Sequence, residues 1–145
     1  MESNSLIGQY SPDFEIPTTT GEVYHFGSEL KRHKLIVVSF IHQDSHSMIV
    51  YLKNLYDQFK DQGLGIVVIN ADTGVSLDTM KELKQSENFD FPYIRDTTGD
   101  VVKSFNVDEM PTVFAIDHQF VVRYGGKVEA NETELQTMIA ELVNA

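Results

Sequence analysis

The chain has 145 residues, 41% of them hydrophobic, which favours one folded domain spanning residues 1–145 over a disordered chain. Its 22 acidic residues outnumber 11 basic ones and give a formal net charge of −11, which argues against nucleic acid as a partner because phosphate binding needs clustered Lys and Arg. No apolar run reaches the roughly 18 residues of a membrane helix, so we expect no membrane insertion. The first residues lack the basic and apolar regions of a signal peptide, so the default expectation for location is the cytoplasm.

The first elements predicted along the chain form an N-terminal β-hairpin. Phe14 and Ile16 alternate with polar neighbours, residues 20–22 (Thr-Gly-Glu) form a turn, and apolar residues resume from Val23. Residues 35–41 are almost all apolar and rich in β-branched side chains, which is typical of a strand covered on both faces.

A helix and a second buried strand follow. Apolar residues recur at helical spacing from Met48 to Phe59, Gly63 stands where a helix ends, and residues 64–69 read as another strand buried on both faces. Strand, helix and strand make a βαβ unit, so we expect the two strands to be parallel. Another helix is predicted over residues 76–87.

The C-terminal third is predicted to hold a short helix around residues 101–105, then two strands at 112–116 and 120–124 that form a hairpin. Two glycines at 125–126 are predicted to end the hairpin, and a final helix follows with its inner face from Leu135 to Leu142. Alternating strands and helices predict an α/β domain with a central mixed sheet flanked by helices.

Four segments, in this order along the chain, resemble a known family. Residues 8–16 are similar to the opening of membrane-anchored-type thioredoxins and of peroxiredoxins, the AhpC/TSA family, and residues 35–40 and 65–72 resemble the strands before and after their active-site helix. Residues 106–117 (Asn-Val-Asp-Glu-Met-Pro-Thr-Val-Phe-Ala-Ile-Asp) are similar to the family segment that carries a cis-proline. The resemblance implies a thioredoxin-like fold, an ancestry among thiol-disulfide oxidoreductases or peroxidases, and a cis Met110–Pro111 peptide bond.

The sequence departs from this family at the residues that carry its chemistry, because the chain contains no cysteine. In register with the family, Ser45 takes the position of the nucleophilic cysteine and Met48 that of the resolving cysteine, while Ser39 stands where many thioredoxins have a buried acid. A helix N-terminus lowers the pKa of a thiol enough to form thiolate, whereas a serine hydroxyl at the same place stays protonated. We therefore expect a redox-inactive protein that uses no cofactor.

The favoured function is a protein- or peptide-binding module. In the family, the backbone just before the cis-proline pairs with an extended substrate segment, and this pairing needs no cysteine. The resemblance therefore implies a binding groove between Ser45 on one side and Met110, Pro111 and Thr112 on the other. Methionine suits such a surface because its side chain is flexible and apolar. The oligomeric state is left open.

Two alternatives stay open beside the binding module. The chain could be a Cys-to-Ser form of an oxidoreductase or peroxidase with Ser45 at the nucleophile position, although a designed two-cysteine knockout is not expected to carry Met48. The other alternative is a copper or zinc site at His42, His46 and Met48. These residues and Asp44 occupy alternate positions along the loop and offer two imidazoles, a carboxylate and a thioether. Against the metal site, the helix predicted to start within this run would spoil the alternation.

Overall fold

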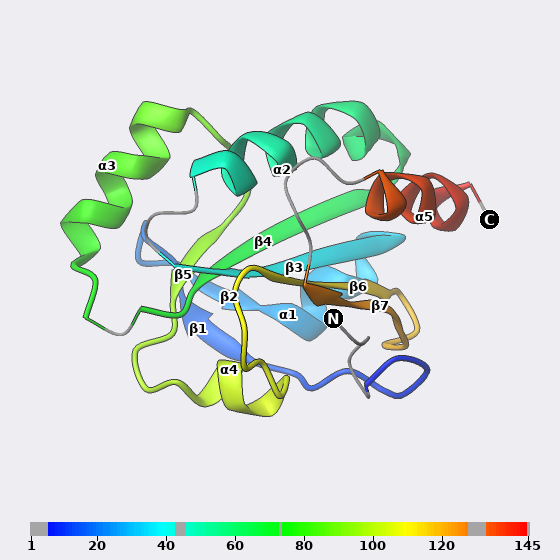
Figure 1. Ribbon diagram of the computed structural model, residues 1–145, viewed down its shortest axis with the longest axis horizontal. Coiled ribbons are helices and arrows are strands. Elements are labelled where there is room, and N and C mark those ends of the chain that lie inside the picture. The colour runs from blue at the N-terminus through cyan, green and yellow to red at the C-terminus, as the bar shows by residue number, and fades with distance from the viewer. Residues whose placement is uncertain (1–5, 43–45, 73, 128–132, 145) are drawn as a thin grey trace.

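The computed structural model describes residues 6–42, 46–72, 74–127 and 133–144 (Figure 1). The strands are β1 Glu15–Pro17, β2 Val23–His25, β3 Leu35–Ile41, β4 Leu64–Asn70, β5 Tyr93–Arg95, β6 Thr112–Asp117 and β7 Val122–Lys127. The helices are α1 Phe26–Lys31, α2 His46–Phe59, the short 3-10 helix η1 Lys60–Gln62, α3 Leu77–Glu87, α4 Asp100–Ser104 and α5 Glu134–Val143. Strands β1 and β2 form an antiparallel hairpin, and the other five form a mixed sheet in the order β5–β4–β3–β6–β7. The predicted architecture is confirmed.

The centre of the sheet is the βαβ unit predicted from the apolar runs. Strands β3 and β4 are parallel, and all seven residues of each strand are buried. Strand β6 pairs antiparallel with the other side of β3, and β7 continues the sheet beyond it. Continuous apolar runs occur here because both faces of these strands are covered, which leaves no position that favours a polar side chain.

Each face of the sheet packs on its own hydrophobic cluster. We call the first the upper cluster; it joins β3 residues such as Val37 to α2, α3 and α5 through side chains that include Ile49, Met80 and Ile139. The second, the lower cluster, joins residues such as Phe40 to the hairpin, α1 and α4. Figure 1 shows α2 and α5 on one side of the sheet and α4 on the other. Burial of these apolar side chains is the main source of stability in a chain that has no disulfide.

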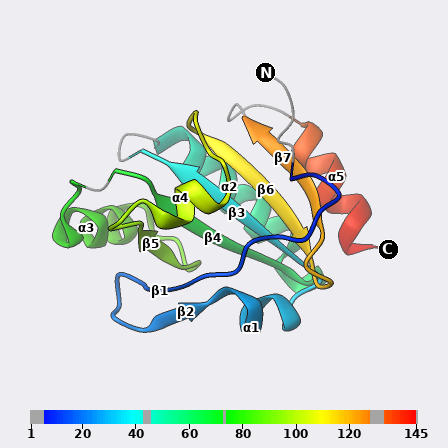
Figure 2. The same ribbon diagram turned by 90° about the horizontal axis from the view of Figure 1, so that it is seen from below.

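The segment before and within the hairpin crosses the lower face of the sheet from one edge to the other, as Figure 2 shows from below. At the β7 edge, Tyr10 forms an isolated bridge with Val121, and at the β5 edge Thr18 does so with Ile94. The Thr19 amide also donates a hydrogen bond to the Tyr93 carbonyl at 3.1 Å. The N-terminal segment therefore contacts both edge strands.

Three local expectations differ from the structure. Helix α1 and strand β5 were not expected, because six and three residues are too short for a periodic pattern to show. The prediction that Gly125 and Gly126 end the last hairpin is wrong, because β7 continues through both to Lys127, with the glycines paired to Phe114 and Val113 of β6. Cross-strand pairing and burial here outweigh the low strand propensity of glycine. Among the described residues, no helix has the length and apolar character needed to cross a membrane.

Candidate functional site

The first half of the predicted groove lies where β3 runs into α2. His42 follows β3 directly and is exposed. Ser45 lies outside the described residues, as does the side chain of His46. Met48 lies in the first turn of α2 with only 2% of its surface exposed, and it packs in the upper cluster. Its thioether is therefore part of the core rather than of an open surface.

The second half of the groove is the turn that precedes β6. The Met110–Pro111 peptide bond is cis. Thr112 is the first residue of β6, where it pairs with Phe40 of β3, and its hydroxyl donates a hydrogen bond to the Glu109 carbonyl at 2.6 Å. Because Phe40 lies two residues before His42, this register places the turn beside the end of β3, next to the segment that leads to residue 45.

Met110 presents both backbone and side chain at this turn. Within the described part of the chain, neither its amide nor its carbonyl takes part in a backbone hydrogen bond. The side chain is half-buried and packs on the edge of the lower cluster. Main-chain groups that have no backbone partner among the described residues, next to an apolar side chain, can pair with an added extended segment.

Asp96 holds the chain that leads to this turn, a role that the sequence reading missed. The residue is fully buried, and its carboxylate accepts hydrogen bonds from the Val102 amide at 2.9 Å and the Val101 amide at 3.3 Å. The carboxylate thereby caps the start of α4, where the preceding Gly99 offers no side chain. In the sequence, Asp96 stands in a polar turn five residues before two valines. This position does not predict a buried cap, because an Asp in such a turn is usually exposed.

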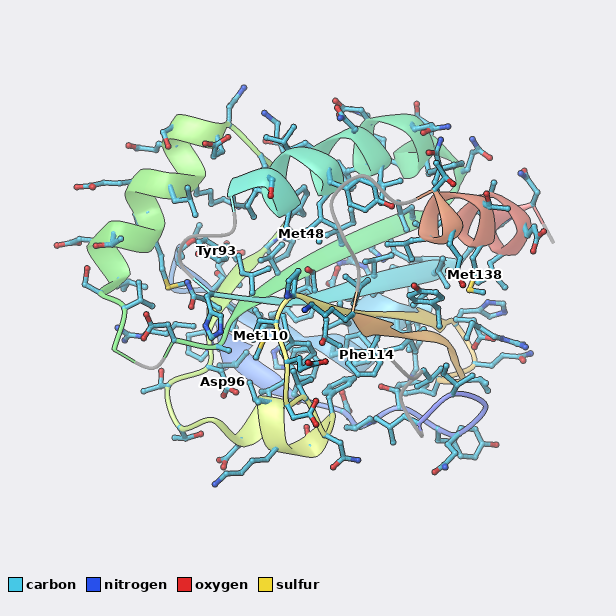
Figure 3. All side chains as sticks on the ribbon, viewed as in Figure 1. Met48, Tyr93, Asp96, Met110, Phe114 and Met138 are labelled. Carbon is cyan, nitrogen blue, oxygen red and sulfur yellow. The ribbon has the colours of Figure 1, made fainter. Side chains whose placement is uncertain are left out.

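Phe105 anchors the end of α4 against the sheet. It is fully buried, and its ring centroid lies 5.3 Å from that of Phe40 and 5.1 Å from that of Phe114. Figure 3 shows Asp96, Met110 and Phe114 on the α4 side of the sheet. Asp96 and Phe105 thus hold the two ends of α4 in place. The segment between α4 and the Met110 turn therefore begins at a fixed position.

Ser39 occupies the centre of β3 on the face of the upper cluster. It is fully buried, and its hydroxyl oxygen has no hydrogen-bond partner among the described residues. Where the resembled thioredoxins have a buried acid, this chain therefore has a small neutral hydroxyl, which cannot take up a proton as a carboxylate does.

Of the three proposed metal ligands, His42 is exposed and Met48 lies in the core, while the side chain of His46 lies outside the described residues. Met48 lies in the upper cluster and Met110 against the lower one, so the two methionines face opposite sides of the sheet (Figure 3). In the ranges that the structure describes, no three His, Asp or Glu side chains are grouped closely enough to hold a metal ion. Any metal site in the loop would need residues beyond those ranges.

Comparisons with known proteins agree on fold and family. The family model for the AhpC/TSA family matches residues 7–130. The Thiol-disulfide oxidoreductase ResA of Bacillus thuringiensis subsp. konkukian is 27% identical over 147 residues, which cover 97% of this chain and 81% of the relative.

Two solved structures show the same fold at low identity. The thioredoxin domain of a thiol-disulfide oxidoreductase from Bacteroides vulgatus superposes with a TM-score of 0.80 at 17% identity, covering 95% of this chain and 98% of that one. A hypothetical protein from Sinorhizobium meliloti 1021 gives a TM-score of 0.84 at 21% identity, covering 98% and 87%. The expected thioredoxin-like fold is thus confirmed, and the chain belongs to the AhpC/TSA family, as a member without cysteine.

Proposed function

We propose that this chain is a redox-inactive, single-domain member of its family that binds an extended protein or peptide segment at Met110, Pro111 and Thr112. The observation that carries the proposal is the Met110 backbone, which has no backbone hydrogen-bond partner among the described residues, beside the half-buried Met110 side chain. The lack of cysteine removes thiol–disulfide exchange, the reaction for which the ResA relatives are named, but it leaves this turn in place.

The expected energetics say what the bound segment must supply. Two main-chain hydrogen bonds to Met110 contribute only about 1–3 kcal/mol in total. A micromolar complex needs about 8 kcal/mol. The remainder has to come from apolar contact, so the partner segment should place a hydrophobic side chain against Met110. The flexible thioether can adapt to more than one such side chain.

In this proposal Ser45 forms the opposite wall of the groove and supports the peptide by polar contact only. A serine nucleophile would need a general base held against its hydroxyl. His42 is exposed, and no carboxylate of the described residues bonds to its ring. Binding without bond cleavage is therefore the simpler use of the site.

The test uses a defined peptide rather than an unknown partner. Peptides from a displayed random library are selected on the folded protein, and the affinity of the best one is measured by fluorescence anisotropy. Met110→Asp should weaken binding at least about tenfold, because a carboxylate replaces the apolar contact and must be desolvated. Met110→Leu should retain most of the affinity.

Leu77→Asp is the matched control, because Leu77 is an exposed apolar side chain at the start of α3 with 37% of its surface accessible. Its replacement should leave the affinity unchanged. The proposal fails if selection yields no peptide, or if the selected peptide binds Met110→Asp as tightly as the unchanged protein.

A further inference from the structure

A second candidate site lies away from the Met110 turn, between the N-terminal hairpin, α1 and the C-terminal end of α3. A cavity of about 330 Å³ opens there, bordered by the hairpin turn, by Tyr24 and Glu29, and by Lys84 and Asp90 from the other side. A smaller cavity of about 150 Å³ shares Tyr24, Glu29 and Asp90 with it. Figure 2 shows the hairpin turn at the same end of the molecule as α3 and β5. We call the two cavities together the hairpin cleft; its size is that of a small-molecule site.

Tyr24 supplies an unused polar group to the hairpin cleft. Only 7% of its surface is exposed, and its ring stacks on that of Phe14 with centroids 5.9 Å apart. No hydrogen bond joins its hydroxyl to any described residue. The fully buried, unpartnered side-chain atoms in the described ranges belong to Ser39 and Arg95, so the Tyr24 hydroxyl keeps some accessible surface. Its electrostatic interaction with Glu29, which lines both cavities beside Tyr24, places this hydroxyl on the side of the cleft.

The hydroxyl is neutral at physiological pH. Burial, with a smaller contribution from the nearby Glu29 carboxylate, raises the pKa of Tyr24 well above its ordinary value. With no partner among the described residues, the phenol oxygen is available as a hydrogen-bond acceptor for a ligand in the cleft. A ligand with N–H donors can donate a hydrogen bond to this oxygen in place of water.

The charges that border the cleft are mostly negative. Carboxylates of Glu22, Glu29 and Asp90 line it, against the single ammonium of Lys84. That ammonium donates a hydrogen bond to the Phe91 carbonyl at 2.7 Å and lies 4.9 Å from the centroid of the Phe89 ring. It also interacts electrostatically with Asp90, so it offsets part of the negative charge that borders the cleft.

Glu29 keeps a free oxygen for a ligand. Its Oε2 accepts a hydrogen bond from the Arg32 guanidinium at 3.1 Å, whereas no described residue bonds to its Oε1. Arg32 is 72% exposed and lies outside the residues that line the cleft, so it weakens the local negative charge without filling the space. The net charge of −11 for the whole chain adds to the attraction for cations.

We propose that the hairpin cleft binds a small organic cation that carries a guanidinium or a primary ammonium group. The N–H groups of the ligand donate to the Tyr24 hydroxyl oxygen and to the Glu29 carboxylate, and Asp90 supports the positive charge. A bare metal ion fits less well, because in the described ranges no three carboxylates or imidazoles are grouped closely enough to coordinate one. An organic cation spans such a separation with its own atoms.

The test titrates two probes into the full chain by isothermal calorimetry. Agmatine presents a free guanidinium and amine, and the tripeptide Gly-Arg-Gly presents the same group as a protein side chain. Tighter binding of agmatine identifies a free small molecule as the source, and tighter binding of the tripeptide identifies an arginine of a partner protein. No saturable binding of either probe overturns the proposal.

Three variants decide whether the cleft is the site. Tyr24→Phe removes only the hydroxyl and Glu29→Gln only the charge, and each should weaken binding about tenfold. Glu82→Gln, an exposed residue of α3 outside the cleft, should leave it unchanged. Unchanged affinity in Tyr24→Phe refutes the site. An equal loss of affinity in Glu29→Gln and Glu82→Gln also refutes it, because the loss would then reflect the overall charge of the protein alone. Circular dichroism of each variant confirms that it is folded.

Discussion

Replacing Ser39 with alanine should stabilise the protein, although truncating a buried side chain usually does the opposite. The Ser39 hydroxyl oxygen is buried in the centre of β3 and has no partner among the described residues. Leaving such a group unsatisfied costs about 1–3 kcal/mol. The void left by one oxygen, roughly 15 Å³, costs about 0.4 kcal/mol at about 24 cal/mol per Å³. The net expectation is a gain of about 1–2 kcal/mol.

Urea unfolding followed by circular dichroism measures this gain. For a chain of this size, about 1–2 kcal/mol corresponds to a rise of about 3–6 °C in the thermal midpoint. The matched control is Ser76→Ala, because Ser76 is the N-cap of α3 and its hydroxyl oxygen accepts a hydrogen bond from the Thr79 amide at 3.1 Å. That cap should be worth about 1 kcal/mol, so the same substitution should destabilise here.

Ser39→Ala and Ser76→Ala are expected to change the free energy of unfolding in opposite directions. If Ser39→Ala lowers stability as much as Ser76→Ala does, then the Ser39 hydroxyl is satisfied in solution and the reasoning from its burial is wrong. An internal water would be the simplest partner in that case, because a buried water commonly satisfies such groups.

Two further predictions concern Asp117 and position 45. Burial acts to raise the pKa of Asp117, but hydrogen bonds from Arg123 Nε and from two backbone amides, with the charge of Arg123, outweigh it and bring the pKa below 3.8. The Asp117–Arg123 pair therefore stabilises the fold above pH 3.8, and this stabilisation is lost as the pH falls through the lower pKa of the folded state. On acidification, Asp117→Asn should lose less stability than the unchanged protein. Equal losses in urea unfolding at several pH values would contradict this. Residue 45 directly precedes α2 in the sequence, so the thiol of Ser45→Cys should have a pKa below about 8.5. Its pKa should also be lower than that of the exposed control Ser86→Cys, as measured by the pH dependence of alkylation. Equal pKa values for the two thiols would refute this prediction.

The core of the fold was predictable because strands that are buried on both faces appear in the sequence as continuous apolar runs. Every residue from Leu35 to Ile41 and from Leu64 to Asn70 is buried, and their apolar runs predicted both strands with errors of at most one residue. Helix α1 and strand β5 left no such mark, since tertiary contacts decide the structure of short segments. The same holds for Gly125 and Gly126, where pairing with β6 continues a strand that local propensity would end.

The candidate site was predictable in position but not in detail. Register with the family located Met110, Pro111 and Thr112 beside the end of β3, and the pairing of Thr112 with Phe40 agrees with that placement. Sequence spacing could not show that Met48 packs into the core, because an apolar side chain in a first helical turn can face either way. Nor could it show that Tyr24 borders a cavity, since the residues that line this cavity come from four separate segments.

The N-terminal segment that contacts both outer strands has a consequence for aggregation. An open strand edge is a template on which another chain can add, and a five-stranded sheet has two such edges. Here the bridges from Tyr10 to Val121 and from Thr18 to Ile94 obstruct both edges with one stretch of backbone. Protection against intermolecular strand addition is therefore not distributed over the fold. A single N-terminal segment protects both edges. A proteolytic cut or a local opening in this segment would therefore expose both edges together.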